Sequence, residues 1–158
     1  MKVKRFFKLM CAFVVVCLIG TMLISTAAFA AAETLPSDVT STKAGLVSLK
    51  VPQQIVSTTT NETLAISATA LPGTTVTVYR FNTVTGEYNK VYLNEAPVEA
   101  VVGPTMLFAG QVELSHGMNK FIIRGESPDG NSTVVRFEVT LLNKGFMERI
   151  KSLIDFHF

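Results

Sequence analysis

The chain has 158 residues, of which 48% are hydrophobic and 16% charged, and its 14 basic and 12 acidic residues give a formal net charge of +2. This near balance, with the cations beyond residue 8 scattered singly, argues against a nucleic-acid-binding domain, which would gather Lys and Arg into a patch or stripe. Both cysteines, Cys11 and Cys17, lie near the start, so the rest of the chain excludes a disulfide scaffold and a thiolate metal site.

Residues 1–30 have the pattern of a secretory signal peptide. A largely apolar run over 9–28 leads to Ala28-Phe29-Ala30, whose small residues fit positions −3 and −1 of a cleavage site. The mature protein is expected to begin near Ala31, secreted or at the cell surface. The basic start of this leader holds four cations: Lys2, Lys4, Arg5 and Lys8. Without them ten basic residues face 12 acidic ones, so the mature chain is slightly acidic.

An uncleaved N-terminal membrane anchor is the alternative, because residues 9–32 exceed the roughly 20 residues that cross a bilayer. Gly20, Thr21 and Ser25 interrupt the apolar run shortly before the cleavage motif. A cleavable signal normally becomes more polar at this point, and cleavage is therefore favoured.

Residues 31–44 are rich in Thr, Ser and acidic side chains and contain few large apolar ones. Such a composition does not offset the entropy that a chain loses on ordering. We predict a flexible spacer over 31–44, followed by a folded domain over 45–142.

The folded domain alternates apolar and polar side chains with the period of two that half-buried strands have. Turn compositions separate these runs, among them Leu71-Pro72-Gly73, Thr85-Gly86 and the segments 115–119 and 128–131. Short strands with a turn every 8 to 12 residues or so indicate a β-sandwich or barrel. Strands are expected over 64–70, 76–79, 88–93, 108–114, 120–127 and 132–141.

The second half of this domain carries a motif of alternating apolar residues and turn residues: Phe108, Val112, Leu114, Gly117, Asn119, Phe121, Ile123, Gly125, Ser127, Asp129, Gly130 and Asn131. This motif resembles the last strands of bacterial immunoglobulin-like domains, such as the accessory domain B of glucodextranases and the repeat modules of bacterial surface proteins. Residues 63–78, with Ala-Leu-Pro-Gly-Thr-Thr-Val-Thr-Val, resemble an early segment of the same group. The resemblance covers roughly residues 50–142 and implies an all-β, immunoglobulin-like antiparallel sandwich. Residues 94–105 depart from the pattern as an insertion at the edge of the sandwich.

The last segment, 143–158, changes to helical spacing, with Gly145 at its boundary. We predict a short C-terminal amphipathic helix that packs over an open end or edge of the sandwich. The alternative is a docking element for a partner or a membrane surface. Apolar side chains and one histidine recur there at intervals of three and four: Phe146, Met147, Ile150, Leu153, Ile154 and His157.

No catalytic constellation appears. The two histidines, His116 in a predicted turn and His157 beside the last residue, lack the rigid support that a Ser-His-Asp arrangement requires. Glu126, Asp129 and Asn131 crowd one turn and offer oxygen ligands, but Asp-Gly-Asn is what a hairpin turn needs without an ion. We expect no enzyme activity, no cofactor and no metal.

The sequence thus predicts a non-catalytic module for binding or spacing at the bacterial envelope, with a glycan or an extracellular protein as partner. Two alternatives remain: an extracellular protein that assembles with itself through a sheet edge or the C-terminal helix, and a secreted enzyme inhibitor. If the domain binds a partner, the inserted loop over 94–105 and exposed Tyr88 and Tyr92 are the expected contacts. The favoured alternative is that both tyrosines only cover the sheet. The predicted partner-binding residues are Tyr88, Tyr92, Phe146, Ile150, Leu153 and Ile154.

Overall fold

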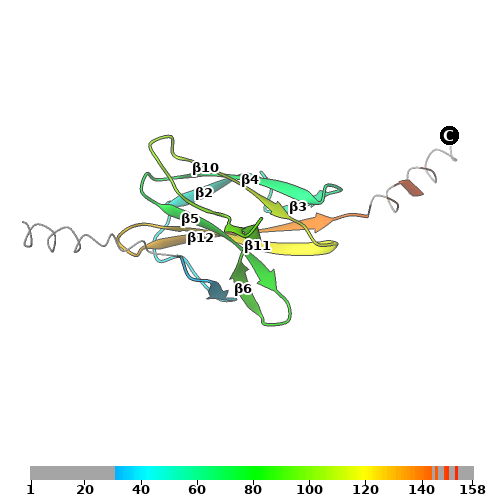
Figure 1. The fold of residues 1–158 in the computed structure, drawn as a ribbon, viewed down its shortest axis with the longest axis horizontal. Coiled ribbons are helices and arrows are strands. Elements are labelled where there is room, and N and C mark those ends of the chain that lie inside the picture. Colours follow the sequence, from blue (N-terminus) through cyan, green and yellow to red (C-terminus); the bar gives the residue numbers. More distant parts are fainter. Residues whose placement is uncertain (1–30, 144, 146–147, 150–151, 153–158) are drawn as a thin grey trace, which may run out of the picture. The chain divides into compact units, whose positions relative to one another are not determined.

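The computed structural model describes residues 31–143 together with Gly145, Glu148, Arg149 and Ser152. Residues 31–143 form an all-β domain (Figure 1). The predicted leader lies outside the described residues, and so does most of the predicted C-terminal helix. Within the described part of the chain, no helix is long and apolar enough to cross a membrane.

The domain consists of short strands joined by turns and one longer insertion. They are β1 (Thr34–Pro36), β2 (Val47–Val51), β3 (Val56–Thr59), β4 (Thr63–Ala70), β5 (Thr75–Asn82), β6 (Glu87–Lys90), β7 (Tyr92–Leu93), β8 (Ala96–Pro97), β9 (Glu99–Val101), β10 (Leu107–Glu113), β11 (Gly117–Glu126) and β12 (Ser132–Leu141). The strands expected from alternation correspond to β4, β5, β6 with β7, β10, β11 and β12, and are confirmed.

Two sheets face each other. The large sheet has the strand order β1-β6-β5-β11-β12-β3, with β9 also paired to β5, and the small sheet has the order β10-β4-β2. β7 and β8 form a separate two-stranded hairpin. All pairs are antiparallel except β12 with β3, which is parallel. The consecutive strands β2 and β3 lie in different sheets, so the chain crosses between the sheets after Val51.

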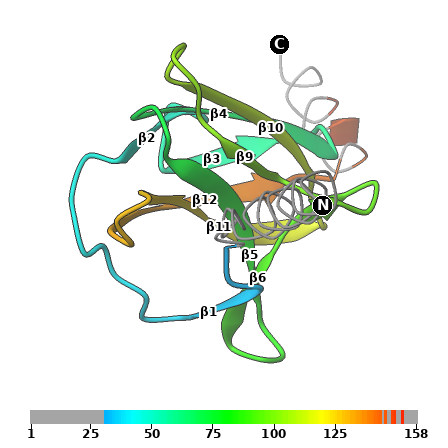
Figure 2. The same ribbon diagram turned by 60° about the vertical axis from the view of Figure 1, so that its left-hand side comes forward.

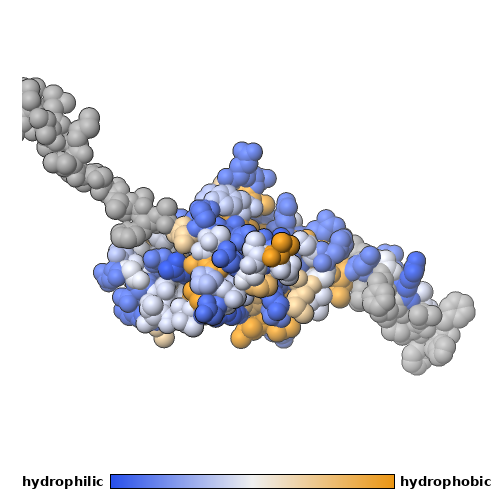
Figure 3. Space-filling view, turned by 90° about the horizontal axis from the view of Figure 1, so that it is seen from below, coloured by the Kyte–Doolittle hydropathy of each residue, from blue (hydrophilic) through white to orange (hydrophobic). Residues whose placement is uncertain are grey.

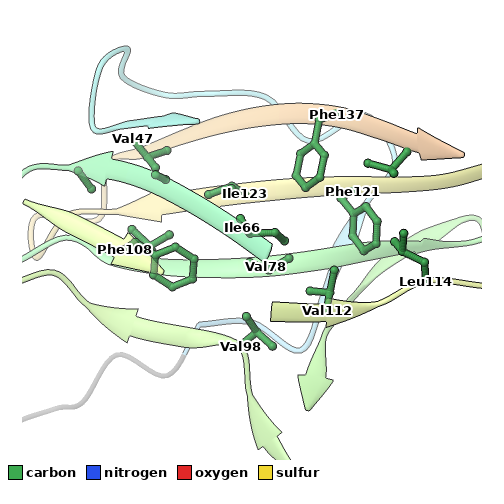
Figure 4. Packing of buried hydrophobic residues seen from close by; sticks show 14 of the residues in the cluster. Val47, Ile66, Val78, Val98, Phe108, Val112, Leu114, Phe121, Ile123 and Phe137 are labelled. Atoms are coloured by element: carbon green, nitrogen blue, oxygen red, sulfur yellow. The ribbon is translucent and has the colours of Figure 1, made fainter. Parts of the chain in front are cut away.

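The hydrophobic core lies between the inner faces of the two sheets, where alternate side chains point toward one another (Figure 4). Ile66 and Phe108 come from the small sheet, and Val78 and Ile123 from the large one. Phe121 and Phe137 come from neighbouring strands, and their rings stack with centroids 5.2 Å apart. This burial of alternate apolar side chains is the main favourable contribution to the stability of the sandwich.

The insertion over 94–105 is built into the sandwich. Its strand β9 pairs with the first half of β5, while β6 pairs with the second half of the same edge. Val98 and Val102 of the insertion are buried in the main core. Val98 lies so close to Gly110 of β10 that a Cβ atom on that glycine would be 2.8 Å from Val98 Cγ1. The insertion therefore extends the large sheet and packs against an edge strand of the small one.

Residues 31–46 form a strap along the large sheet, in place of the flexible spacer predicted over 31–44. Ala31 is 7% exposed and Leu35 is 6% exposed. Strand β1 pairs with β6, placing Leu35 opposite Tyr88. The spacer prediction was wrong here because the strap is held mainly by hydrogen bonds of its backbone and short polar side chains, which composition does not reveal. Figure 2 shows the chain leaving β1 and running beside the sheet to β2.

The strap is fastened to the start of β12 by short polar side chains. Thr42 N donates to Ser132 O at 2.8 Å, and Ser132 N donates to Thr42 Oγ1 at 2.7 Å. Val134 N donates to Ser41 Oγ at 2.9 Å, and Arg136 donates to two strap carbonyl oxygens. These bonds satisfy backbone groups along the first part of β12, an edge that β3 leaves unpaired.

A second, smaller hydrophobic cluster lies on the outer face of the large sheet, away from the main core. Its buried members are Leu35, Tyr79, Tyr88 and Ile122, with Val39, Phe81 and Val134 packed around them. The strap supplies Leu35 and Val39 to this cluster. Figure 3 shows a face of the domain that is mainly hydrophilic, with apolar side chains in separate small patches.

A close approach of the two sheets at Gly125 gives a stability prediction. A Cβ atom on Gly125 would lie 2.9 Å from Val47 Cβ and 3.2 Å from Thr74 Cγ2, and Val47 Cβ is fixed to the backbone of β2. Gly125→Ala should therefore lower the free energy of unfolding by about 1–3 kcal/mol, measured by urea denaturation. The matched control is Gly103→Ala, since a Cβ atom on Gly103 meets nothing within 4 Å. Equal denaturation midpoints for the two variants would contradict the prediction.

Candidate ligand-binding cleft

A polar cleft of about 420 Å³ lies where the β5–β6 hairpin extends beyond the core. Its volume falls within the roughly 300–1,000 Å³ that small-molecule sites occupy. The side chains available to it are a cation, a carboxylate, two amides and one aromatic ring, from Arg80, Glu113, Asn82, Asn89 and Tyr92, because those of Phe81 and Lys90 lie on the outer face of the hairpin. The lining residues are Arg80, Phe81, Asn82, Thr83, Asn89, Lys90, Val91, Tyr92 and Glu113.

The alternation of β5 explains why polar groups line this cleft. Val76 and Val78 point into the main core, and the next residues on the same side of the strand are Arg80 and Asn82. Asn89 of β6 is registered directly opposite Arg80, so both side chains lie on the same face of the hairpin. The inner face thus changes from apolar to polar at the point where the sandwich ends.

Arg80 lies partly buried at the inner end of this face. Its guanidinium carbon is 5.2 Å from the centroid of the Phe121 ring, which is a cation–π contact. Nη1 makes one long hydrogen bond, 3.5 Å, to Ser115 Oγ, and the buried Nε has no hydrogen-bond partner among the described residues. Burial lowers the pKa of Arg80, while the nearby carboxylate of Glu113 acts in the opposite direction.

Tyr92 and Tyr88, two of the predicted partner-binding residues, have different surroundings. Tyr92 is 50% exposed and lines the cleft, as expected of a contact residue. Tyr88 is only 6% exposed and therefore covers the sheet, in agreement with the favoured alternative and not with a role as an exposed contact. The Tyr88 ring packs edge-on against Phe81 with centroids 5.1 Å apart, and the strap covers it through Leu35. The other four predicted residues lie in the tail, outside the described residues.

The inserted loop, which was expected to contribute to binding, borders a second and smaller hollow of about 230 Å³. This hollow lies between the insertion and β10. Its lining is largely apolar: Leu93, Ala96, Pro97, Val98, Glu99, Phe108, Ala109, Gly110 and Gln111. It offers fewer polar groups than the cleft and is therefore a weaker candidate for a specific ligand.

A buried lysine fixes the strap on the outer face of the same hairpin. The Lys90 side chain is 4% exposed, and its Nζ lies 3.0 Å from Glu33 Oε1 and 3.3 Å from Glu99 Oε2. Nζ also donates a 2.6 Å hydrogen bond to the carbonyl oxygen of Ala31. Tyr92 Oη donates to Glu33 Oε2 at 2.8 Å. The buried ammonium is therefore fully partnered, as such a group must be.

These contacts shift the pKa values of both partners. Burial alone would lower the pKa of Lys90, but the hydrogen bonds and attraction from Glu33 and Glu99 outweigh it, so the pKa lies above 10.5. Hydrogen bonds from Tyr92 and Lys90 hold the pKa of Glu33 below 4.5. Both groups stay charged across the neutral range.

The cleft offers hydrogen-bond donors, acceptors and an aromatic surface, which suit binding. His116 lies exposed in the turn between β10 and β11. In the described part of the chain, no group of three or more His, Cys, Asp or Glu side chains is placed to hold a metal ion.

No protein-family model matches the chain, and a search of curated proteins finds no match.

Sequence reasoning missed most of the cleft. The available signal was the break in the alternation of β5, where Arg80 and Asn82 take positions that continue the apolar series. The contributions of Asn89, Lys90 and Glu113 depend on how β6 and β10 are placed beside β5. No spacing along the sequence indicates that these three residues border the same cleft.

The strap should loosen at both extremes of pH. Because the pKa of Glu33 is lowered in the folded state, its contribution is present above pH 4.5 and is lost as the pH falls through the folded value. Because the pKa of Lys90 is raised, its contribution is present below pH 10.5 and is lost as the pH rises through the folded value. Amide exchange of Lys90, whose N–H donates to Glu33 O at 2.8 Å, should lose protection at both limits.

The acid limit can be assigned with a variant. Glu33→Gln should remove most of the acid-dependent loss of protection at the Lys90 amide. Glu138→Gln is the control, since Glu138 forms its 3.7 Å ion pair with Lys120, away from the strap. An unchanged acid profile in Glu33→Gln would show that Glu33 does not hold the strap.

Proposed function

We propose that the chain is an exported, non-catalytic binding module of the bacterial envelope, built on an immunoglobulin-like β-sandwich. The leader pattern of residues 1–30 supports export, and the cleft supports binding. The partner is a glycan or an extracellular protein. No nucleic acid is involved, because the mature chain carries ten basic and 12 acidic residues.

The strand order supports the immunoglobulin-like part of the proposal. In such domains one sheet contains the first, second and fifth strands side by side, and the other contains the third, sixth and seventh. The order β10-β4-β2 fits the first set, and β5-β11-β12 fits the second, extended by β6 as in variable-type domains. The early strand that is divided between the two sheets as β2 and β3 agrees with this interpretation. The sequence motif over β10 and β11 points the same way.

The cleft carries the proposal of binding. Placing polar groups on the inner face of a strand forgoes hydrophobic stabilisation, and here three of them surround a hollow: Arg80, Asn82 and Asn89. Apolar side chains at these positions would extend the core and bury more surface. A ligand that satisfies these donors and acceptors accounts for the arrangement.

Export is tested by intact mass. When the full chain is expressed in a Gram-positive host, we expect a soluble extracellular species that begins near Ala31. Cleavage at this point leaves Ala31 and Glu33 in place for the strap contacts with Lys90. A full-length species in the membrane fraction would show that the leader is an anchor and would contradict secretion.

Binding is tested by co-sedimentation of the secreted protein with isolated bacterial envelopes. Tyr92→Ala should weaken binding by roughly tenfold, because an exposed aromatic ring in a cleft supplies much of the contact energy. Tyr92→Phe should retain most of the affinity, and Leu107→Ala, another exposed apolar position, serves as the control. Failure of the wild type to sediment with any envelope preparation would contradict the proposed function.

A further inference from the structure

Arg80 differs from the other partly buried cations of the domain in forming no ion pair among the described residues, although the carboxylate of Glu113 is near enough to act on its pKa. Lys90 has two carboxylates within 3.3 Å, and Arg124 has Glu126 at 3.1 Å. No carboxylate of the described residues lies within 4.0 Å of the Arg80 nitrogen atoms. A cation withdrawn from water is normally paired, so Arg80 keeps a charge that a ligand could neutralise.

The contacts of Arg80 determine which of its atoms remain for a ligand. The guanidinium carbon lies 5.2 Å from the centroid of the Phe121 ring, which covers one side of the group, and Nε is closed off from solvent. The terminal nitrogens remain, of which Nη1 makes only the long bond to Ser115 Oγ. Two N–H donors of a planar guanidinium match the geometry of a carboxylate.

The remaining lining residues suit a hydroxylated ring. The amide oxygen of Asn82 already accepts hydrogen bonds from the backbone of Val84 and Thr85, which leaves its NH₂ group as a donor. Asn89 brings a second amide to the same face. Tyr92 offers a half-exposed ring on which the apolar face of a sugar can stack.

We propose that the cleft binds an acidic sugar of the uronate class, with Arg80 holding its carboxylate and Asn82, Asn89 and Tyr92 contacting its ring. This inference rests on the proposed function and names its ligand class. Glu113 also lines the cleft and accepts hydrogen bonds from ring hydroxyl groups. Its negative charge repels a carboxylate ligand. A substitution that removes this charge therefore tests whether the ligand is negatively charged.

The test is isothermal titration calorimetry of the secreted protein with trigalacturonate and with its fully methyl-esterified form. The two probes share the sugar ring and differ in charge. We expect the acid to bind at least tenfold more tightly than the ester. Arg80→Gln should abolish this preference, and Arg80→Lys, which keeps the charge without the planar fork, should retain only part of it.

Two further variants separate binding from folding. Glu113→Gln changes an exposed side chain that makes no ion pair among the described residues, and it should strengthen binding of the acid severalfold. Arg124→Gln makes the same charge change as Arg80→Gln outside the cleft and should leave the preference intact. Thermal melting of each variant checks that it is folded.

The outcomes distinguish this inference from the proposed function. Equal binding of acid and ester, or binding of neither probe, would overturn the uronate assignment. If envelope co-sedimentation persisted in that case, the binding module would stand with another class of partner. Loss of acid preference in Arg124→Gln to the same extent as in Arg80→Gln would also overturn the assignment, because the effect would then be general electrostatics.

Discussion

The period of two along β5 is the constraint on which the rest of the structure depends. One side of this strand places Val76 and Val78 in the main core and then Arg80 in the cleft. The other side places Tyr79 and Phe81 in the outer cluster beneath the strap. Since successive side chains of a strand point to opposite faces, a shift of register by one residue would exchange these environments. Core, cleft and strap site are therefore fixed by one register.

Both edges of β5 are hydrogen-bonded to other strands. One edge pairs with β11, and the other is shared between β9 and β6. After β6 the chain leaves the sheet and forms the β7–β8 hairpin. It then returns as β9, which completes the same edge of β5. This arrangement holds the β5–β6 hairpin in place beyond the core, where it would otherwise lack support. It also covers backbone groups that an open edge would expose.

The strap and the cleft lie on opposite faces of this hairpin. On the outer face, Leu35 packs over Tyr79 and Tyr88, and the ammonium of Lys90 binds the carbonyl oxygen of Ala31. On the inner face, Arg80 and Asn89 remain open to the cleft. Fixing one face restricts the motion of the other, so the strap helps to hold the cleft in one geometry. Tyr92 joins the two, because it lines the cleft and donates to Glu33.

The sequence by itself determined the all-β class, the places of the six alternating segments and most of the turns. These depend on local rules: side chains alternate along a strand, and Gly, Pro and Asn occupy turns. Such features require no knowledge of which strands become neighbours.

Only the tertiary structure decided the role of residues 31–44, the burial of Tyr88 and the composition of the cleft. The strap has little apolar surface of its own and becomes ordered through hydrogen bonds to β12, a strand about 90 residues later in the chain. Tyr88 is buried because that strap lies over it, and Arg80 meets Asn89 and Glu113 because three strands come together. Each of these features depends on contacts between distant segments, and local composition carries no information about which segments meet.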